Sequence, residues 1–420
     1  MDKDLVGKGF HILAKPIGAS CNLNCKYCFY TEKKALFKNE DNFKMSDEIL
    51  EVFIKKYISS QEIPEIQFVW QGGEPTLMGI DFFNKVITLQ KKYAGNKKIM
   101  NSLQTNGTLL NNEWCKFLKE NNFLVGLSID GPEELHDNYR VDINEKPTLN
   151  KVINGLTLLK KYKIPFNVLV SVTRESSREP LKLYHFLKEQ EIEFIQFTPI
   201  VERAPDKDII AIKDGLKHAT PESNYDENQE VLVTNFSVKS GEYGEFLIKI
   251  FDEWVQNDVG KIYIMNFEWA LEAWMGLPST VCIFSKQCGR ALTIEHNGNI
   301  YSCDHYVYNE NYLGNIINDN LNEILEKSKQ KAFGQNKELL LPHVCKDCEV
   351  RFACNGECPR HRFMRTYDSQ VGLSYLCKDY KKFFRHIHRY MKVMVQLITN
   401  DLPAERIMDI IKGSIIISKR

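Results

Sequence analysis

Three cysteines near the start of the chain constrain its fold and chemistry more than any other feature. Cys21, Cys25 and Cys28 are separated by three and then two residues, in a loop that follows a short apolar run at residues 11–16. Three thiolates are one fewer than a four-coordinate iron–sulfur cluster or structural zinc ion needs. A cluster held by three cysteines keeps one iron open to another ligand. The simpler alternative is a structural zinc ion with a distant fourth ligand.

Composition indicates a globular protein without a polyanionic partner. The chain has 420 residues, enough for two or three domains, and 55 Lys plus Arg balance 55 Asp plus Glu. A nucleic-acid-binding protein usually carries a basic excess, so we expect no nucleic-acid partner. The first ten residues lack the apolar segment of a signal peptide, and no run approaches the roughly 20 apolar residues of a membrane helix. We therefore expect a cytoplasmic protein with no membrane partner.

The other cysteines are also grouped. Of twelve cysteines, eleven fall within residues 21–28 and 282–377, and only Cys115 stands apart. Grouped thiols in a reducing compartment usually bind metal rather than form disulfides. The second group holds eight thiols, enough for two four-cysteine sites: Cys282, Cys288, Cys303, Cys345, Cys348, Cys354, Cys358 and Cys377. Zinc ribbons are the alternative, although only one pair has their C-x-x-C spacing. Cys115 lies on an amphipathic stretch and is predicted to be a buried, inert thiol.

Short β-rich runs alternate with helical stretches from residue 10 to about 200. The predicted strands are 11–15, 66–70, 98–103, 123–129, 166–172 and 194–198, and the predicted helices between them are 46–59, 80–93, 111–121, 148–162 and 180–190. Ser46 and Asn111 are suitable N-caps. This alternation predicts an α/β fold with a parallel sheet, and six strands indicate a partial barrel. Active sites in such folds lie at the carboxyl ends of the strands.

The remaining segments differ in character. Residues 202–240 are polar and are interpreted as an irregular insertion or linker. Helical spacing returns at residues 243–256 and 267–275, and later at 380–400 and 403–412.

Polar residues follow several predicted strands. Gln71, Gly72 and Gly73 come directly after the second strand, and Ser128 ends the fourth, with Arg140 beyond it. Glycine allows a backbone to approach a ligand closely, and the guanidinium of arginine can bind a carboxylate through two nitrogens. Considered alone, these residues are better explained as a turn, a cap and a surface arginine.

The cysteine triplet, with Tyr27 beside its last member, resembles the signature of radical S-adenosylmethionine (SAM) enzymes. In that family the three cysteines hold a [4Fe–4S] cluster whose open iron binds SAM, and the cofactor generates a 5′-deoxyadenosyl radical. The stretch from Gln71 to Pro75 is similar to the GGEP segment of the family. The resemblance implies that Tyr27, Gly73, Ser128, Arg140 and Val201 contact SAM.

The second cysteine group is similar to the SPASM domain of radical SAM enzymes that modify peptides or proteins. That resemblance implies two auxiliary [4Fe–4S] clusters, and hence three clusters in all. One auxiliary cluster would take Cys282, Cys288, Cys303 and Cys358. The other would take Cys345, Cys348, Cys354 and Cys377. Sequence spacing alone does not pair these thiols.

Cys303-Asp304-His305-Tyr306 narrows the resemblance to the anaerobic sulfatase-maturating enzymes. Matching stretches extend over nearly the whole chain, apart from about residues 202–240. The family converts a Cys or Ser of a sulfatase to Cα-formylglycine without oxygen, so Asp304 is implied as the general base. Tyr30 and Gln71 match positions that contact the peptide. The implied partners are a sulfatase segment of type Cys/Ser-x-Pro/Ala-x-Arg and an electron donor such as flavodoxin or ferredoxin.

These inferences predict a particular domain order. A radical SAM partial (β/α)6 barrel of the TIM type spans residues 1–235, connecting helices span 236–281, an irregular SPASM domain spans 282–380 and a helical tail spans 381–420. Two other functions remain open. A SPASM maturase would form thioether or other crosslinks in a small precursor peptide. A zinc-stabilised scaffold would dock a partner without catalysis.

Overall fold

An open parallel sheet forms the framework of the computed structural model, which describes residues 9–38, 43–221 and 233–413. Its first six strands run parallel, each paired with the next along the chain. They are β1 (His11–Lys15), β2 (Glu65–Trp70), β3 (Lys98–Thr105), β4 (Leu124–Ser128), β5 (Phe166–Val172) and β6 (Phe194–Pro199). All six correspond to predicted strands, with ends shifted by a few residues. The predicted α/β fold with a parallel sheet is therefore confirmed.

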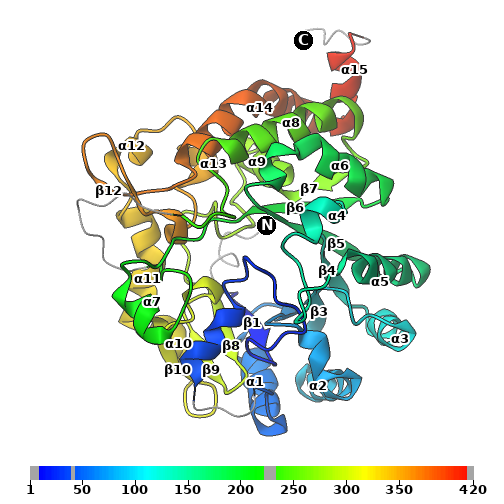
Figure 1. The fold of residues 1–420 in the computed structure, drawn as a ribbon, viewed down its shortest axis with the longest axis vertical. Helices are drawn as coiled ribbons and strands as arrows, with labels where there is room; N and C mark the ends of the chain where they lie inside the picture. The colour runs from blue at the N-terminus through cyan, green and yellow to red at the C-terminus, as the bar shows by residue number, and fades with distance from the viewer. Residues whose placement is uncertain (1–8, 39–42, 222–232, 414–420) are drawn as a thin grey trace.

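Helices follow the outer side of this sheet in chain order (Figure 1). They are α1 (Asp47–Ser60), α2 (Ile80–Tyr93), α3 (Asn112–Glu120), α5 (Leu149–Lys161) and α6 (Pro180–Glu189). The side chain of Ser46 accepts the N–H of Ile49, and that of Asn111 accepts the N–H of Trp114, so both predicted N-caps are present. Trp70, fully buried on β2, packs against Phe53 of α1 and Phe83 of α2. These contacts fix the helices to the sheet.

Four strands that the sequence did not predict extend the sheet at both edges. Beside β1 lie β8 (Ala291–Glu295), β9 (Asn299–Tyr301) and β10 (Tyr312–Asn315), and β7 (Tyr263–Ile264) lies beside β6. β8 is parallel to β1 over its whole length, from the pair His11 and Ala291 to the pair Lys15 and Glu295. The first part of the cysteine-rich segment is therefore continuous with the barrel sheet. This continuity brings the residues after β8 and β9 toward the N-terminal cysteine loop.

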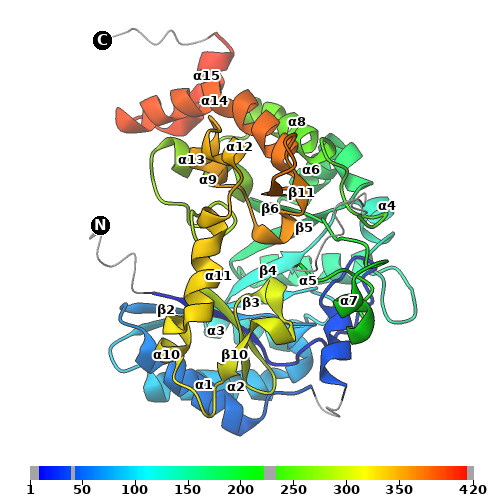
Figure 2. The same cartoon turned by 90° about the vertical axis from the view of Figure 1, so that its left-hand side faces the viewer.

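Three long helices pack together at the other end of the molecule (Figure 2). They are α8 (Glu242–Asn257), α9 (Met265–Trp274) and α14 (Cys377–Thr399). The buried carboxylate of Asp379, in the first turn of α14, accepts the N–H groups of Gly241 and Gly244 at the start of α8. A Cβ on Gly244 would lie 2.6 Å from the carbonyl oxygen of Asp379, so this close crossing depends on glycine.

Short elements complete the chain. The short helices are η1 (Thr31–Phe37), η2 (Pro75–Met78), α4 (Glu133–His136), η3 (Ser176–Arg178), α7 (Ile209–Asp214), η4 (Asp304–Tyr306), η5 (Asn309–Asn311), α10 (Leu321–Glu326), α12 (His343–Lys346), α13 (Arg351–Cys354), η6 (Pro359–His361), η7 (Ala404–Arg406) and α15 (Ile407–Ile411). A longer helix, α11 (Ser328–Leu339), and the hairpin of β11 (Met364–Arg365) and β12 (Val371–Leu373) complete the cysteine-rich segment.

The described residues of the predicted polar insertion at 202–240 include regular structure. They contain α7, and Arg203 forms an isolated β-bridge with Val233. Residues 222–232 of this insertion, and residues 1–8 and 414–420 of the predicted terminal domains, lie outside the described residues. In the part of the chain that the structure describes, no helix is long and apolar enough to cross a membrane.

Candidate active site and cysteine clusters

The N-terminal cysteine loop is fixed by contacts to two neighbouring strand ends. The Sγ of Cys21 accepts hydrogen bonds from the N–H of Leu23 at 3.3 Å and from the side-chain amide of Asn106, just after β3, at 3.8 Å. Beyond β4, the N–H of Asn24 donates to the carbonyl of Val141 at 2.8 Å. The predicted placement of these cysteines at the carboxyl ends of the strands is therefore observed.

The three thiols of this loop influence one another. Burial, with smaller contributions from the neighbouring thiols, raises the pKa of Cys21 to about 11 and that of Cys25 to about 12. Three thiolates at this spacing would repel one another without a positive counter-charge, which a metal cluster supplies. The donor set therefore fits a [4Fe–4S] cluster held by three cysteines.

The loop after β2 packs against the residues that lead into the cysteine loop. The N–H of Gly73 donates to the carbonyl of Gly18 at 2.8 Å, and that of Glu74 donates to the carbonyl of Ser20 at 2.9 Å. A Cβ on Gly73 would lie 1.9 Å from the Ser20 oxygen, a distance that no side chain tolerates. The fully buried Glu74 accepts the N–H of Asn106 at 2.7 Å and so connects this loop to the end of β3.

Replacing Gly73 with alanine is expected to displace the loop that carries Cys21. The added Cβ meets backbone rather than a flexible side chain, and overpacking of this kind costs about 1–3 kcal/mol. A shift of roughly 1 Å at a reacting centre can lower the rate about 100-fold. We expect G73A to show that loss in SAM cleavage, measured as 5′-deoxyadenosine. In the control G95A, the left-handed backbone of Gly95 (φ +58°) makes alanine locally strained as well, but the new Cβ meets no atom within 4 Å, so cleavage is retained. Equal cleavage by G73A and wild type would contradict this account.

Tyr27, Asp130 and Arg140 form a buried cluster beside the cysteine loop. The hydroxyl of Tyr27 donates to Asp130, whose carboxylate also accepts the Nε of Arg140 at 2.7 Å. A second oxygen of Asp130 accepts the N–H of Ser171 at 2.8 Å. Arg140, which the sequence assigned to SAM, is therefore already paired with a carboxylate, and this pairing orients its guanidinium.

The other predicted SAM contacts also lie at strand ends. Ser128 is the last residue of β4, and its hydroxyl accepts the side-chain amide of Gln104 at 3.1 Å. Val201 is buried just after β6. Gln71, which was predicted to contact the peptide rather than SAM, is half-buried after β2, and its backbone N–H donates to the carbonyl of Ala14 at 2.9 Å.

Asp304 lies in a buried polar cluster next to the barrel. Its carboxylate forms an ion pair with Lys15, the last residue of β1, whose ammonium lies 3.9 Å from the ring centroid of Tyr30. The hydroxyl of Tyr30 donates to Glu295, which is fully buried at the end of β8. Burial acts to raise the pKa of Asp304, but Lys15 and other cationic neighbours bring it below its usual value. Asp304 is therefore ionised at neutral pH.

A second buried ion pair borders this cluster. The guanidinium of Arg360 pairs with Glu202 and donates to the Nδ1 of His305 at 2.6 Å. It also lies 4.2 Å from the ring centroid of Phe29, on which His305 stacks. Burial, followed by the charge of Arg360, lowers the pKa of His305 to about 3, so its imidazole is neutral. These contacts join the N-terminal loop, the segment after β6 and the cysteine-rich segment.

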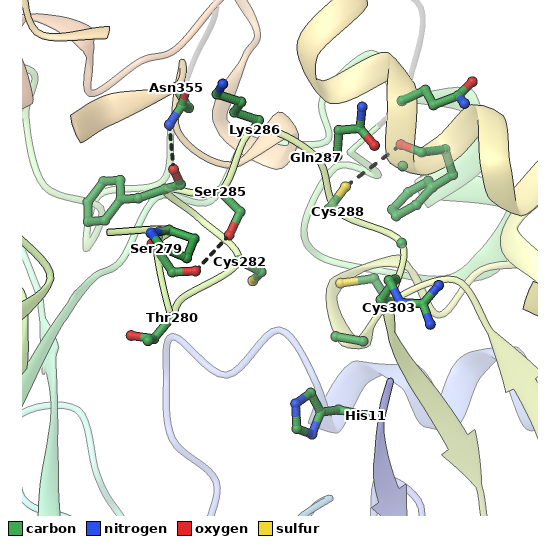
Figure 3. A pocket seen from close by; sticks show the side chains of 18 of the residues that line it. His11, Ser279, Thr280, Cys282, Ser285, Lys286, Gln287, Cys288, Cys303 and Asn355 are labelled. Atoms are coloured by element: carbon green, nitrogen blue, oxygen red, sulfur yellow. Dashed lines mark hydrogen bonds between the residues drawn. The ribbon is translucent and has the colours of Figure 1, made fainter. Parts of the chain in front are cut away.

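Eight of the nine other thiols lie in two separate groups. Cys282, Cys288 and Cys303 line a cavity of about 1000 Å³ (Figure 3). Burial raises the pKa of Cys303, and Cys358 and Cys282 raise it further, so Cys358 belongs to the same group. Cys345, Cys348, Cys354 and Cys377 line another cavity of about 290 Å³. Four thiols around such a space suit a cluster of several atoms, whereas a zinc ion requires all four sulfurs about 2.3 Å from one centre.

Several residues of the site were not found from the sequence. Lys15 and Glu295 each end a strand, and only the pairing of β1 with β8 places them side by side. Glu202 and Arg360 are distant in sequence and meet only in the folded chain. The one available signal was the charge of Lys15 at the end of an otherwise apolar run. Cys115 is fully buried on α3 in the main core, far along the chain from either thiol group.

Comparisons with known proteins agree with this arrangement. A model of the radical SAM superfamily matches residues 16–187, and a model of the SPASM iron-sulfur cluster-binding domain matches residues 282–349. The serine-type anaerobic sulfatase-maturating enzyme of Bacteroides thetaiotaomicron is 46% identical over 405 residues, which are 96% of this chain and 96% of that protein. The chain belongs to the anaerobic sulfatase-maturating enzyme family.

Other members of the family are also similar. The cysteine-type anaerobic sulfatase-maturating enzyme of Clostridium perfringens is 36% identical over 378 residues, covering 89% of this chain and 95% of that protein. The solved structure of the sulfatase-maturating enzyme anSMEcpe, with bound AdoMet and Cp18Cys peptide, aligns with a TM-score of 0.79. It is 35% identical and covers 92% of this chain and 99% of that chain. The radical SAM core followed by a SPASM domain, which the resemblance of the cysteine motifs implied, is confirmed.

Proposed function

We propose that this chain oxidises a Cys or Ser side chain of a sulfatase polypeptide to Cα-formylglycine without oxygen. The observation that carries the proposal is the position of Asp304. It follows directly after a thiol of the second cysteine group, and its carboxylate pairs with Lys15 at the end of the strand that precedes Cys21, Cys25 and Cys28. A proton acceptor thus lies between the two regions that supply radical chemistry and electron uptake in this family.

We propose that Cys21, Cys25 and Cys28 hold one [4Fe–4S] cluster and that the two groups of four thiols hold the auxiliary clusters. Tyr27, Gly73, Ser128, Arg140 and Val201 are proposed to border SAM. When bound, SAM and the clusters supply a 5′-deoxyadenosyl radical and an acceptor for one further electron.

The residues of the chain then have distinct tasks. The substrate must lose a hydrogen atom from Cβ, and afterwards a proton from its thiol or hydroxyl together with one electron. From Ser these losses leave the aldehyde directly. From Cys they leave a thioaldehyde, which water hydrolyses to the aldehyde with release of hydrogen sulfide. The ionised carboxylate of Asp304 accepts that proton. Lys15 holds the carboxylate in place through their ion pair. Because its hydroxyl is bound by Glu295, Tyr30 presents a fixed ring at this site, where it is proposed with Gln71 to contact the peptide.

The proposed partner is an extended sulfatase segment of type Cys/Ser-x-Pro/Ala-x-Arg. This follows from the family, because the related structure holds a peptide named Cp18Cys. Similar relatives include both serine-type and cysteine-type enzymes, so both residues belong in the test. A flavodoxin or ferredoxin as electron donor, and a cytoplasmic location, remain predictions.

The test uses anaerobically reconstituted protein, SAM, a reductant and three peptides that carry Cys, Ser or Ala at one position. We expect mass spectrometry to show an aldehyde in the Cys peptide, the Ser peptide or both, and no change in the Ala peptide. Cleavage of SAM with all three peptides unchanged, together with crosslinking of a cysteine-rich precursor peptide, would favour the peptide maturase instead. A colourless, iron-free preparation that binds zinc would favour the scaffold.

A further inference from the structure

A buried lysine lies beside the first auxiliary cysteine group, and the proposed reaction does not use it directly. Lys337, on α11, has only 1% of its surface exposed. Its ammonium donates to three backbone carbonyls, those of Cys282 at 2.5 Å, Ile283 at 2.9 Å and Ser285 at 2.5 Å. All three carbonyls belong to the loop that carries Cys282 and leads to Cys288. The labelled cysteines of this loop border the cavity in Figure 3.

The hydrogen-bond pattern requires the charged form of this lysine. Three acceptors need three N–H bonds, which an ammonium has and a neutral amine lacks. Among the described residues, no carboxylate forms an ion pair with Lys337. The acidic groups that act on it are the thiols Cys358, Cys282 and Cys288. The positive charge therefore lies beside the cysteine group without an ion-pair partner of its own, while the buried carboxylate of Glu357 acts on Cys282 and Cys358 in the opposite direction.

The influence of Lys337 is confined to one of the two thiol groups. Burial raises the pKa of Cys282 and Cys288, and Lys337 is the strongest opposing influence on both. Arg362 differs in this respect, because it acts on Cys358 of one group and on Cys345 and Cys354 of the other. Its guanidinium donates to the carbonyls of Gly356, Asn355, Glu357 and Lys337. Lys337 thus acts on Cys282, Cys288 and Cys358, all of the group that contains Cys303, and its ammonium is held to the loop of Cys282 by three hydrogen bonds.

We infer that Lys337 is a fixed positive charge that raises the reduction potential of the cluster proposed at Cys282, Cys288, Cys303 and Cys358. A nearby cation stabilises the reduced, more negative form of a cluster, and the effect is large where water is excluded. A higher reduction potential favours electron uptake by this cluster, one of whose proposed ligands, Cys303, directly precedes Asp304. Lys337 is a positioning residue in this sense, since it acts through the cluster. The inference rests on the proposed ligand set of this cluster.

The test measures potentials rather than turnover. Cys21, Cys25 and Cys28 are replaced by alanine in every sample, so that only the two auxiliary clusters remain, and each is titrated by EPR without SAM or peptide. In the variant K337M we expect one potential to fall by at least about 59 mV, which is a tenfold change in a one-electron equilibrium constant. The other potential should not move. K337R, which keeps the charge, should stay near the parent protein.

Two further variants separate charge from a structural role. K331M removes a lysine of the same helix that is paired with Glu326 at the surface, and both potentials should be unchanged. K337Q removes the charge, but its amide still donates two hydrogen bonds to the loop. It therefore replaces K337M in the titration if K337M binds less iron than the parent protein. Iron-loaded neutral variants with unchanged potentials would overturn the inference. Loss of the cluster in both neutral variants would also overturn the inference, because the role of Lys337 would then be to hold the loop of Cys282 in place. Neither result bears on formylglycine formation, which the peptide test measures separately.

Discussion

The variant C21A is expected to lose reductive cleavage of SAM completely. Cys21 is one of three thiols in a loop that contacts the segments following β3 and β4. The two thiols left in the variant are too few to retain a [4Fe–4S] cluster. The first cluster should be lost while both auxiliary clusters remain. We expect about eight irons per chain in place of about twelve. 5′-Deoxyadenosine and formylglycine should both fall below detection, as measured by liquid chromatography and mass spectrometry.

Cys115 provides the matched control. It is a buried thiol on α3 and lies in the main core, apart from the eleven clustered cysteines. C115A should keep the full iron content and cleave SAM at the rate of the wild type. Retained cleavage in C21A would show that the first cluster is held elsewhere, and loss of iron in C115A would show that iron content reports only general damage.

The variant D304N is expected to separate SAM cleavage from product formation. An amide has the shape of the carboxylate but cannot accept the proton, and general base catalysis contributes about 100-fold to 10,000-fold. Formylglycine should therefore fall at least about 100-fold. Cleavage of SAM should remain largely intact, because Asp304 is outside the N-terminal cysteine loop. The ratio of 5′-deoxyadenosine to aldehyde, measured in one sample, should rise accordingly.

The control for this variant is D252N, which makes the same chemical change at a carboxylate between α8 and α14, where Asp252 binds His386 at 2.6 Å. Both products should form there at wild-type rates. An unchanged aldehyde yield in D304N would remove Asp304 from the role of base. A parallel fall of both products in D304N, with loss of iron, would indicate damage to the neighbouring ligand Cys303 instead.

The barrel strands were predictable because they are β-rich runs of five to eight residues, and amphipathic helices separate them. The N-caps Ser46 and Asn111 were predictable because capping is a local interaction. β8, β9 and β10 are five residues or shorter. β8 pairs with β1, which lies 280 residues earlier in the chain, and β9 and β10 extend the sheet from β8. Their formation depends on tertiary pairing with β1, which periodicity does not report.

The residues of the site divide in the same way, into local features that the sequence predicts and contacts between distant segments that it does not. The cysteine groups were predictable because ligand spacing is a property of the sequence. The ion pair of Lys15 with Asp304, and that of Glu202 with Arg360, arise only when distant segments meet. Arg140 was assigned to SAM by family resemblance, and the structure adds its pairing with Asp130, which a sequence does not reveal. The individual ligand and contact assignments therefore remain proposals for mutagenesis.

The central claim is that the radical attacks Cβ of a Cys or Ser in a sulfatase segment. The most direct measurement uses the same Cys and Ser peptides with deuterium on Cβ, incubated anaerobically with the reconstituted enzyme and SAM. The account predicts one deuterium in the 5′-deoxyadenosine and one in the formylglycine aldehyde of the same reaction. Unlabelled 5′-deoxyadenosine formed alongside an aldehyde, or deuterium transfer without any aldehyde, would contradict it.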